Sequence, residues 1–355
     1  MHSLFSFSSH PRLRAFFYGL LLCLSGGVAQ PAYATFDPVN DDTDIFLANP
    51  NIAADRPNVL LYVDNTANWN TPFVNEKSAL VNVVNSLDDS YNVGLMLFPE
   101  TGNPNDNTDG GYARFAIRRM TTTNKTVLAS IVNNFDKLND KGNNNTLSLG
   151  MVEVYRYYAG LAERASNHKV KTDYNGNNEF KACTSCNPAH WYTTNNPAQD
   201  KTAAQTPTDG LGNYALNSNS DGALYNSPID PTGCSNNYLI YISNGGANEN
   251  ASALSTAQSE LSTAGYDTSQ IIQINPNGQQ GNWMDEWAKF LATADVNGAG
   301  VGTPHVFTYT LEVNPITTGQ GPSMTALMRS VATNGKGQYF SATDTNAGAE
   351  IEAAL

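Results

Sequence analysis

The feature that most constrains this chain is a set of short, uninterrupted apolar runs separated by segments of helical periodicity. Two of these runs are Asn58-Val-Leu-Leu-Tyr-Val-Asp64 and Tyr238-Leu-Ile-Tyr-Ile-Ser243. Their β-branched and aromatic residues at consecutive positions are typical of strands buried on both faces. Further strands are predicted at 91–98, 114–120, 305–313 and 338–341. The alternation of charged and apolar residues at 114–120 indicates a strand at a sheet edge.

Helical periodicity fills most of the intervals between these runs. It predicts helices at 74–88, 124–138, 147–163, 251–264, 283–294, 322–334 and 346–355. Strands that are apolar on both faces and alternate with helices predict an α/β fold with a doubly wound, mostly parallel sheet.

The first 34 residues have the order of a secretory signal peptide. Arg12 and Arg14 precede an apolar run at 15–24, and Ala32-Tyr-Ala34 forms a small-residue cleavage site. The run is too short to span a bilayer, and no other stretch approaches a transmembrane span. We therefore predict an exported protein with a signal peptide at 1–34, an acidic segment at 35–57 and one domain at 58–355.

Residues 166–233 interrupt the alternation and are predicted to form a long irregular insertion. Cys183 and Cys186 lie inside it and Cys234 follows it, and export makes disulfide bonding the expected state of these three cysteines. The alternative is a zinc site of the three cysteines with His190. The aromatic residues of the insertion either form a contact surface or pin the insertion to the domain. They are Tyr174, Phe180, Trp191, Tyr192, Tyr214 and Tyr225.

Charge and motifs exclude several classes of protein. The chain has 19 basic and 32 acidic residues and a net charge of −13, which argues against a nucleic-acid-binding surface. No G-x-S-x-G, H-E-x-x-H, Walker A or dinucleotide-binding motif is present. Asp285 and Glu286 are adjacent on a predicted helix, so we expect them to be solvated rather than a catalytic pair. Trp283 and Trp287 are four residues apart and indicate a packed helix face. We therefore predict a protein that is not an enzyme.

Polar residues follow the first strand at the edge where doubly wound sheets bind ligands. Asp64, Thr66 and Asn68 place a carboxylate, a hydroxyl and an amide oxygen in one loop. Hard oxygen ligands of this kind suit Mg²⁺ or Mn²⁺.

With this loop the chain resembles von Willebrand factor type A domains, in which three loops form a metal-ion-dependent adhesion site. The resemblance implies a Rossmann-like sheet with one antiparallel edge strand. It assigns Asp64, Thr66 and Asn68 to the first loop, Asn145 or Thr146 to the second, and Asn244 to the third. Asn68 and Asn244 stand where the family has Ser and Asp. Asp64 is then the single carboxylate of a degenerate site, so we expect weak binding of Mg²⁺ or Mn²⁺. The alternative is that the site binds no metal and Asp64 hydrogen-bonds its own loop.

A narrower resemblance extends from about residue 44 to 355. The blocks that carry it are Phe46-Leu-Ala-Asn-Pro50, Arg56-Pro-Asn-Val-Leu60, Asp64 to Trp69, Cys234 to Gly245, Met284 to Leu291 with Asp295, His305 to Thr310 and Gly335 to Ala342. They are similar, in order, to the PilY/PilC family of type IV pilus assembly and tip proteins. The resemblance implies a non-enzymatic adhesion module that acts in the periplasm, at the cell surface or at the pilus tip. Its partners would be pilins, minor pilins, pilus assembly proteins and a host or surface ligand.

Two other interpretations of the function stay open. One is a stand-alone secreted type A domain that binds a surface or matrix ligand unrelated to pili. The other is a metal-dependent periplasmic enzyme subunit or chaperone with the same fold.

The last predicted helix reaches Leu355 without a C-cap glycine. We therefore expect the natural protein to continue, with the β-propeller that follows in the family.

Overall fold

The computed structural model describes thirteen stretches of the chain, all within the compact unit Ala53–Leu355. They are residues 56–65, 71–98, 110–135, 146–164, 180–183, 190–193, 215–217, 223–230, 236–243, 245–298, 304–313, 321–342 and 350. The predicted signal peptide and nearly all of the acidic segment 35–57 lie outside these residues, as does the predicted last helix apart from Glu350.

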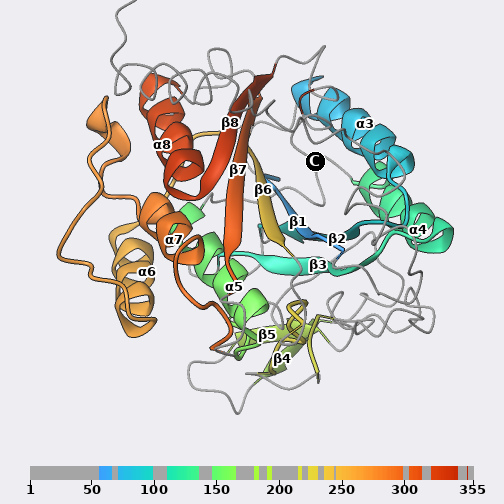
Figure 1. Ribbon diagram of the computed structural model, residues 1–355, viewed down its shortest axis with the longest axis horizontal. Helices are drawn as coiled ribbons and strands as arrows, with labels where there is room; N and C mark the ends of the chain where they lie inside the picture. The colour runs from blue at the N-terminus through green and yellow to red at the C-terminus, as the bar shows by residue number, and fades with distance from the viewer. Residues whose placement is uncertain are drawn as a thin grey trace, which may run out of the picture. The chain divides into compact units, whose positions relative to one another are not determined.

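A six-stranded sheet forms the centre of the unit (Figure 1). Its order is β3-β2-β1-β6-β7-β8, and every neighbouring pair is parallel except β2 and β3. The α/β prediction and the mostly parallel sheet are thus confirmed, and the antiparallel edge strand is present; the arrangement is compatible with a Rossmann-like fold. The strands are β1 (Asn58–Val63), β2 (Asn92–Leu97), β3 (Tyr112–Arg119), β6 (Asn237–Ser243), β7 (Val306–Val313) and β8 (Lys336–Ala342).

Helices cover both faces of the sheet, which explains why the sequences of the central strands are continuous apolar runs. Helices α3 (Thr71–Ser86) and α4 (Thr122–Asn133) pack against the face that carries Leu61 and Ile240. On the other face, Tyr62 and Tyr241 belong to a core shared with four further helices. These are α5 (Leu147–Ala159), α6 (Ala251–Thr263), α7 (Met284–Leu291) and α8 (Gly321–Asn334), and the short 3₁₀ helix η3 (Asn277–Gln279) precedes α7.

Helix α5 approaches the sheet closely through its glycine. A Cβ atom added at Gly150 would lie 2.5 Å from the hydroxyl oxygen of Tyr62 and 2.8 Å from its ring. The same hydroxyl donates a hydrogen bond to the carbonyl of Gly110 at 3.2 Å. Only a residue without a side chain therefore fits at position 150 while Tyr62 keeps its place.

The insertion at 166–233 was predicted to be irregular, but regular strands occur within its described residues, so the prediction is wrong there. Strands β4 (Phe180–Cys183) and β5 (His190–Thr193) form a two-stranded antiparallel sheet. Ala215, Leu216 and Ile229 are buried in the domain core. Tyr225 is also buried, with its ring centroid 5.1 Å from that of Tyr157. At Tyr225, therefore, the aromatic side chain pins the insertion to the domain.

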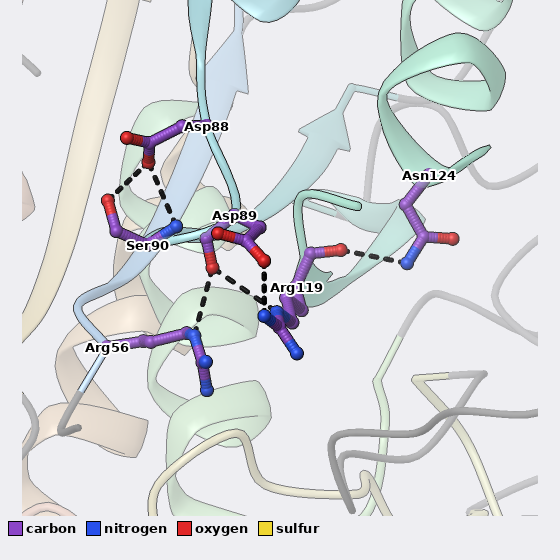
Figure 2. A network of polar contacts seen from close by, with 6 residues as sticks. All are labelled: Arg56, Asp88, Asp89, Ser90, Arg119 and Asn124. Carbon is purple, nitrogen blue, oxygen red and sulfur yellow. Dashed lines mark hydrogen bonds and ion pairs between the residues drawn. The ribbon is translucent and has the colours of Figure 1, made fainter. Parts of the chain in front are cut away.

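A polar network lies at the amino ends of β1 and β2, opposite the ligand-binding edge expected of such sheets (Figure 2). Arg119 forms an ion pair with Asp89, and Arg56 donates a hydrogen bond to the Asp89 carbonyl at 2.9 Å. Asn124 donates to the Arg119 carbonyl at 2.8 Å. Because Asp89 and Arg56 are exposed or partly exposed, we assign this network to anchoring of the turn before β2.

Candidate functional site

Asp64 lies where the sequence places it, directly after β1 at the carboxyl edge of the sheet. Its side chain is fully buried, and its backbone N–H donates to the carbonyl of Ile242 in β6 at 2.8 Å. The chain continues from β1 toward β2 on one side, whereas β6 and β7 lie on the other. The sheet order therefore reverses between β1 and β6, and doubly wound sheets bind ligands at that point.

Asn65 fixes the start of the loop that follows. Its side-chain oxygen accepts the Phe98 N–H at 2.7 Å, and its side-chain nitrogen donates to the Phe98 carbonyl at 2.9 Å. These two bonds tie the end of β1 to the end of β2. Asn65 was not singled out from the sequence, because both of its hydrogen bonds reach a residue 33 positions away.

Thr146 is the N-cap residue of α5 and is buried, but its side chain makes no capping hydrogen bond. The cap comes from Glu249, in the loop after β6. A Glu249 carboxylate oxygen accepts the backbone N–H of Ser148 at 2.8 Å, and the other lies 3.0 Å from the Ser148 hydroxyl. A negative group at a helix N-terminus satisfies unpaired N–H groups and offsets the positive end of the helix dipole.

Glu249 also connects α5 to α7. Asn282 donates a hydrogen bond to its carboxylate, and Ser148 accepts the backbone N–H of Trp283 at 3.1 Å. Burial raises the pKa of Glu249 to about 7, although its hydrogen bonds to Ser148, Leu149 and Asn282 act in the opposite direction. Glu249 was not singled out from the sequence, because its partners lie in α5 and just before α7, both distant in the chain.

Ser243 ends β6 at the same edge as Asp64. It is fully buried, and its hydroxyl donates to the carbonyl of Gly245 at 3.0 Å. The loop predicted to supply the third part of the site thus begins beside β1. The pKa of Tyr62, two residues before Asp64, reflects the negative charge of this region. Burial raises this pKa well above its usual value, and the charges of Asp64, Glu153 and Glu249 raise it further.

The remaining predicted site residues are divided between described and undescribed parts of the chain. Asp64 and Thr146 are described, whereas Thr66, Asn68, Asn145 and Asn244 lie outside the described residues, as do Cys186 and Cys234. Cys183 ends β4, where the backbone pairs it with His190 of β5. Within the described stretches, no group of three or more His, Cys, Asp or Glu residues could hold a metal ion. The oxygen atoms of Asp64, Thr146 and Ser243 are nevertheless hard donors of the type that Mg²⁺ and Mn²⁺ accept.

The expectation that Asp285 and Glu286 are solvated is wrong. Both side chains are almost fully buried, at 2% and 1% exposure. Asp285 accepts the Ser330 hydroxyl of α8 at 2.6 Å, and Glu286 accepts the Ile272 N–H at 2.8 Å. Burial and repulsion by Asp285 raise the pKa of Glu286 to about 8. Adjacent residues do point to different sides of α7, but α8 encloses one side and the 266–274 loop another. The packed face expected of Trp283 and Trp287 is confirmed.

A scan of protein-family models finds no match to the chain. A search of curated proteins finds no significant match. Among the described residues, no helix combines the length and the apolar character needed to cross a membrane.

Proposed function

We propose that this domain is a von Willebrand factor type A-like interaction module of a PilY/PilC-like type IV pilus protein. The observation that carries the proposal is the burial of Asp64 at the strand-order reversal between β1 and β6. The antiparallel edge strand β3 also agrees with a type A topology. The ordered sequence blocks that resemble the PilY/PilC family supply the connection to pili.

In this proposal Asp64 holds Mg²⁺ or Mn²⁺ together with oxygen atoms of the second and third loops. A bound ion would supply an open coordination position for an acidic group of the partner. Because Glu249 supplies the α5 cap, the Thr146 hydroxyl is not required for that task. Asp64 provides the charge, and the neutral oxygens provide only weak support, so the affinity for the ion is low.

The metal part of the proposal is tested by thermal shift with Mg²⁺ and Mn²⁺. The Asp64→Asn variant, which keeps the side-chain shape, is expected to lose the metal-dependent shift. Asp88→Asn is the matched control, because Asp88 is an exposed carboxylate at the opposite end of the sheet. An equal shift in wild type and Asp64→Asn removes Asp64 from the site.

The pilus part is tested in the native host. Pili are sheared from the cells and searched by mass spectrometry for peptides of this chain. Enrichment of these peptides with pilin supports the pilus module. Recovery from the medium or the periplasm alone contradicts it and favours the stand-alone secreted domain.

A further inference from the structure

A second concave site lies away from Asp64, at the β8 end of the sheet. It is a pocket of about 580 Å³ between the segment before η3, helix α8 and strand β8. Its volume falls within the range of roughly 300–1,000 Å³ that is usual for ligand sites. Its walls include Asn275, Pro276, Thr325, Arg329, Tyr339 and Ser341.

The wall formed by Asn275 and Pro276 is held in place by its neighbours. The Gln280 side chain accepts the Ile274 N–H at 3.0 Å and donates to the Ile272 carbonyl. Glu286 holds the same segment through the Ile272 N–H at 2.8 Å. The pocket is therefore largely preformed, which reduces the ordering cost of binding.

A buried carboxylate organises the opposite wall. Glu312 of β7 is fully buried; one oxygen accepts the Thr325 hydroxyl at 3.1 Å and the other accepts the Tyr339 hydroxyl at 2.7 Å. The Tyr339 ring then forms a platform for Arg329, whose guanidinium carbon lies 4.9 Å from the ring centroid. Residues 321, 322, 325, 326 and 329 of α8 share the helix face that lines the pocket.

Arg329 is the charged residue among those that line this pocket. A guanidinium carries five N–H donors and no acceptor. Within the described part of the chain, Arg329 contacts the Tyr339 ring but makes no hydrogen bond or ion pair. The two oxygens of nearby Glu312 accept the Thr325 and Tyr339 hydroxyls. Burial raises the pKa of Glu312, and the charge of Arg329 acts in the opposite direction without a direct hydrogen bond. The Arg329 side chain is exposed to solvent. Planar bidentate pairing makes a carboxylate the complementary partner.

The rest of the pocket indicates what carries that carboxylate. Pro276, Pro322 and Ala326 offer apolar surface beside Arg329, which suits a short aliphatic stem. Strand β8 ends the sheet order, and among the described residues its outer edge has no paired strand. An extended peptide can add to such an edge, with a side chain seated in a neighbouring pocket.

We propose that this pocket binds a carboxylate of an extended peptide from a partner protein. Arg329 pairs with the carboxylate, Tyr339 and Glu312 hold Arg329 in position, and the apolar residues receive the stem. This site is independent of the metal proposal, because it uses neither Asp64 nor its loops.

Three probe peptides test the proposal by NMR titration of the ¹⁵N-labelled protein. The first is acetyl-Ala-Leu-Glu-Leu-Ala-amide, the second has Gln in place of Glu, and the third is the Gln peptide with a free C-terminal carboxylate. We expect the Glu peptide to shift the Arg329 Nε–H signal and the amide signals of β8. The Gln amide should bind at least ~10-fold more weakly, the factor that corresponds to about 1.4 kcal/mol. The third peptide shows whether a terminal carboxylate also serves.

Two variants complete the test. Arg329→Gln is expected to abolish the response to the Glu peptide. Lys336→Gln, which removes an exposed cation at the amino end of β8, should leave it unchanged. Equal binding of the Glu and Gln amides, or wild-type binding by Arg329→Gln, overturns the proposal. Equal losses in both variants would indicate a general charge effect and would also overturn it.

Discussion

Replacing Glu153 by glutamine is expected to stabilise the protein at pH 8 and to change its stability little at pH 5. Glu153 lies in α5 and is fully buried. One of its oxygens accepts the Tyr225 hydroxyl and the Arg164 N–H, whereas the other has no hydrogen-bond partner among the described residues. Burial, followed by repulsion from Glu163, raises its pKa from 4.5 to about 7.

The sign of the effect follows from proton binding. Between pH 4.5 and about 7 the folded protein keeps the proton on Glu153, whereas the unfolded chain releases it. The free energy of unfolding therefore falls as the pH rises through this interval. At about 1.4 kcal/mol per pH unit, the loss from this group reaches roughly 3 kcal/mol by pH 7. Glutamine keeps the shape of the neutral acid and does not ionise, so this loss disappears.

Urea unfolding at pH 5, 6, 7 and 8 measures the difference between Glu153→Gln and wild type. Comparing the two chains at each pH removes the contributions of the other buried acids. Tyr225→Phe is the informative second variant, because its loss of a donor to the carboxylate raises the Glu153 pKa further. It should extend the stability loss above pH 7. A difference between Glu153→Gln and wild type that does not change with pH would refute the reasoning.

Two further predictions concern α5. Gly150→Ala should cost ~1–3 kcal/mol in urea unfolding, because the new Cβ meets the Tyr62 hydroxyl at 2.5 Å, and adding Tyr62→Phe should recover part of this loss. A Gly150→Ala protein as stable as wild type would contradict the close packing. Glu249→Ala should cost about 2–4 kcal/mol, since it removes the cap on Ser148 and leaves buried donors without an acceptor. Hydrogen exchange at the start of α5 should accelerate; unchanged exchange there would show that Glu249 is not the cap.

The sequence predicted the sheet well because its central strands are buried on both faces. The run from Asn58 can be identified as a strand without knowing which strand it pairs with, because consecutive apolar β-branched and aromatic residues are typical of buried strands. The hairpin of β4 and β5 was missed for the converse reason. Two four-residue strands in an Asn- and Gly-rich segment depend on pairing with each other, and neither has an apolar run that marks it.

The polar residues were harder to predict because their roles depend on contacts distant in the sequence. Asp64 was found because it follows a recognisable strand. Glu249 acts on Ser148, 101 positions away, and nothing local marks it as a helix cap. Asp285 and Glu286 were predicted to be solvated from helix geometry alone. That geometry says nothing of α8 and the 266–274 loop, which pack around α7 and bury both side chains.

The carboxyl edge of the sheet has opposite electrostatic character at two places. Between β1 and β6, Asp64 and Glu249 bring negative charge, and both raise the pKa of Tyr62. Glu249 also occupies the N-terminus of α5, where an external anion could otherwise bind. This region therefore favours a cation, in agreement with the proposed metal site. At the end of β8, the buried Glu312 accepts two hydroxyl donors, and the exposed cation Arg329 lines the pocket. Arg329 offers an exposed cation to an anionic ligand there, so the two proposed sites on one sheet edge take ligands of opposite charge.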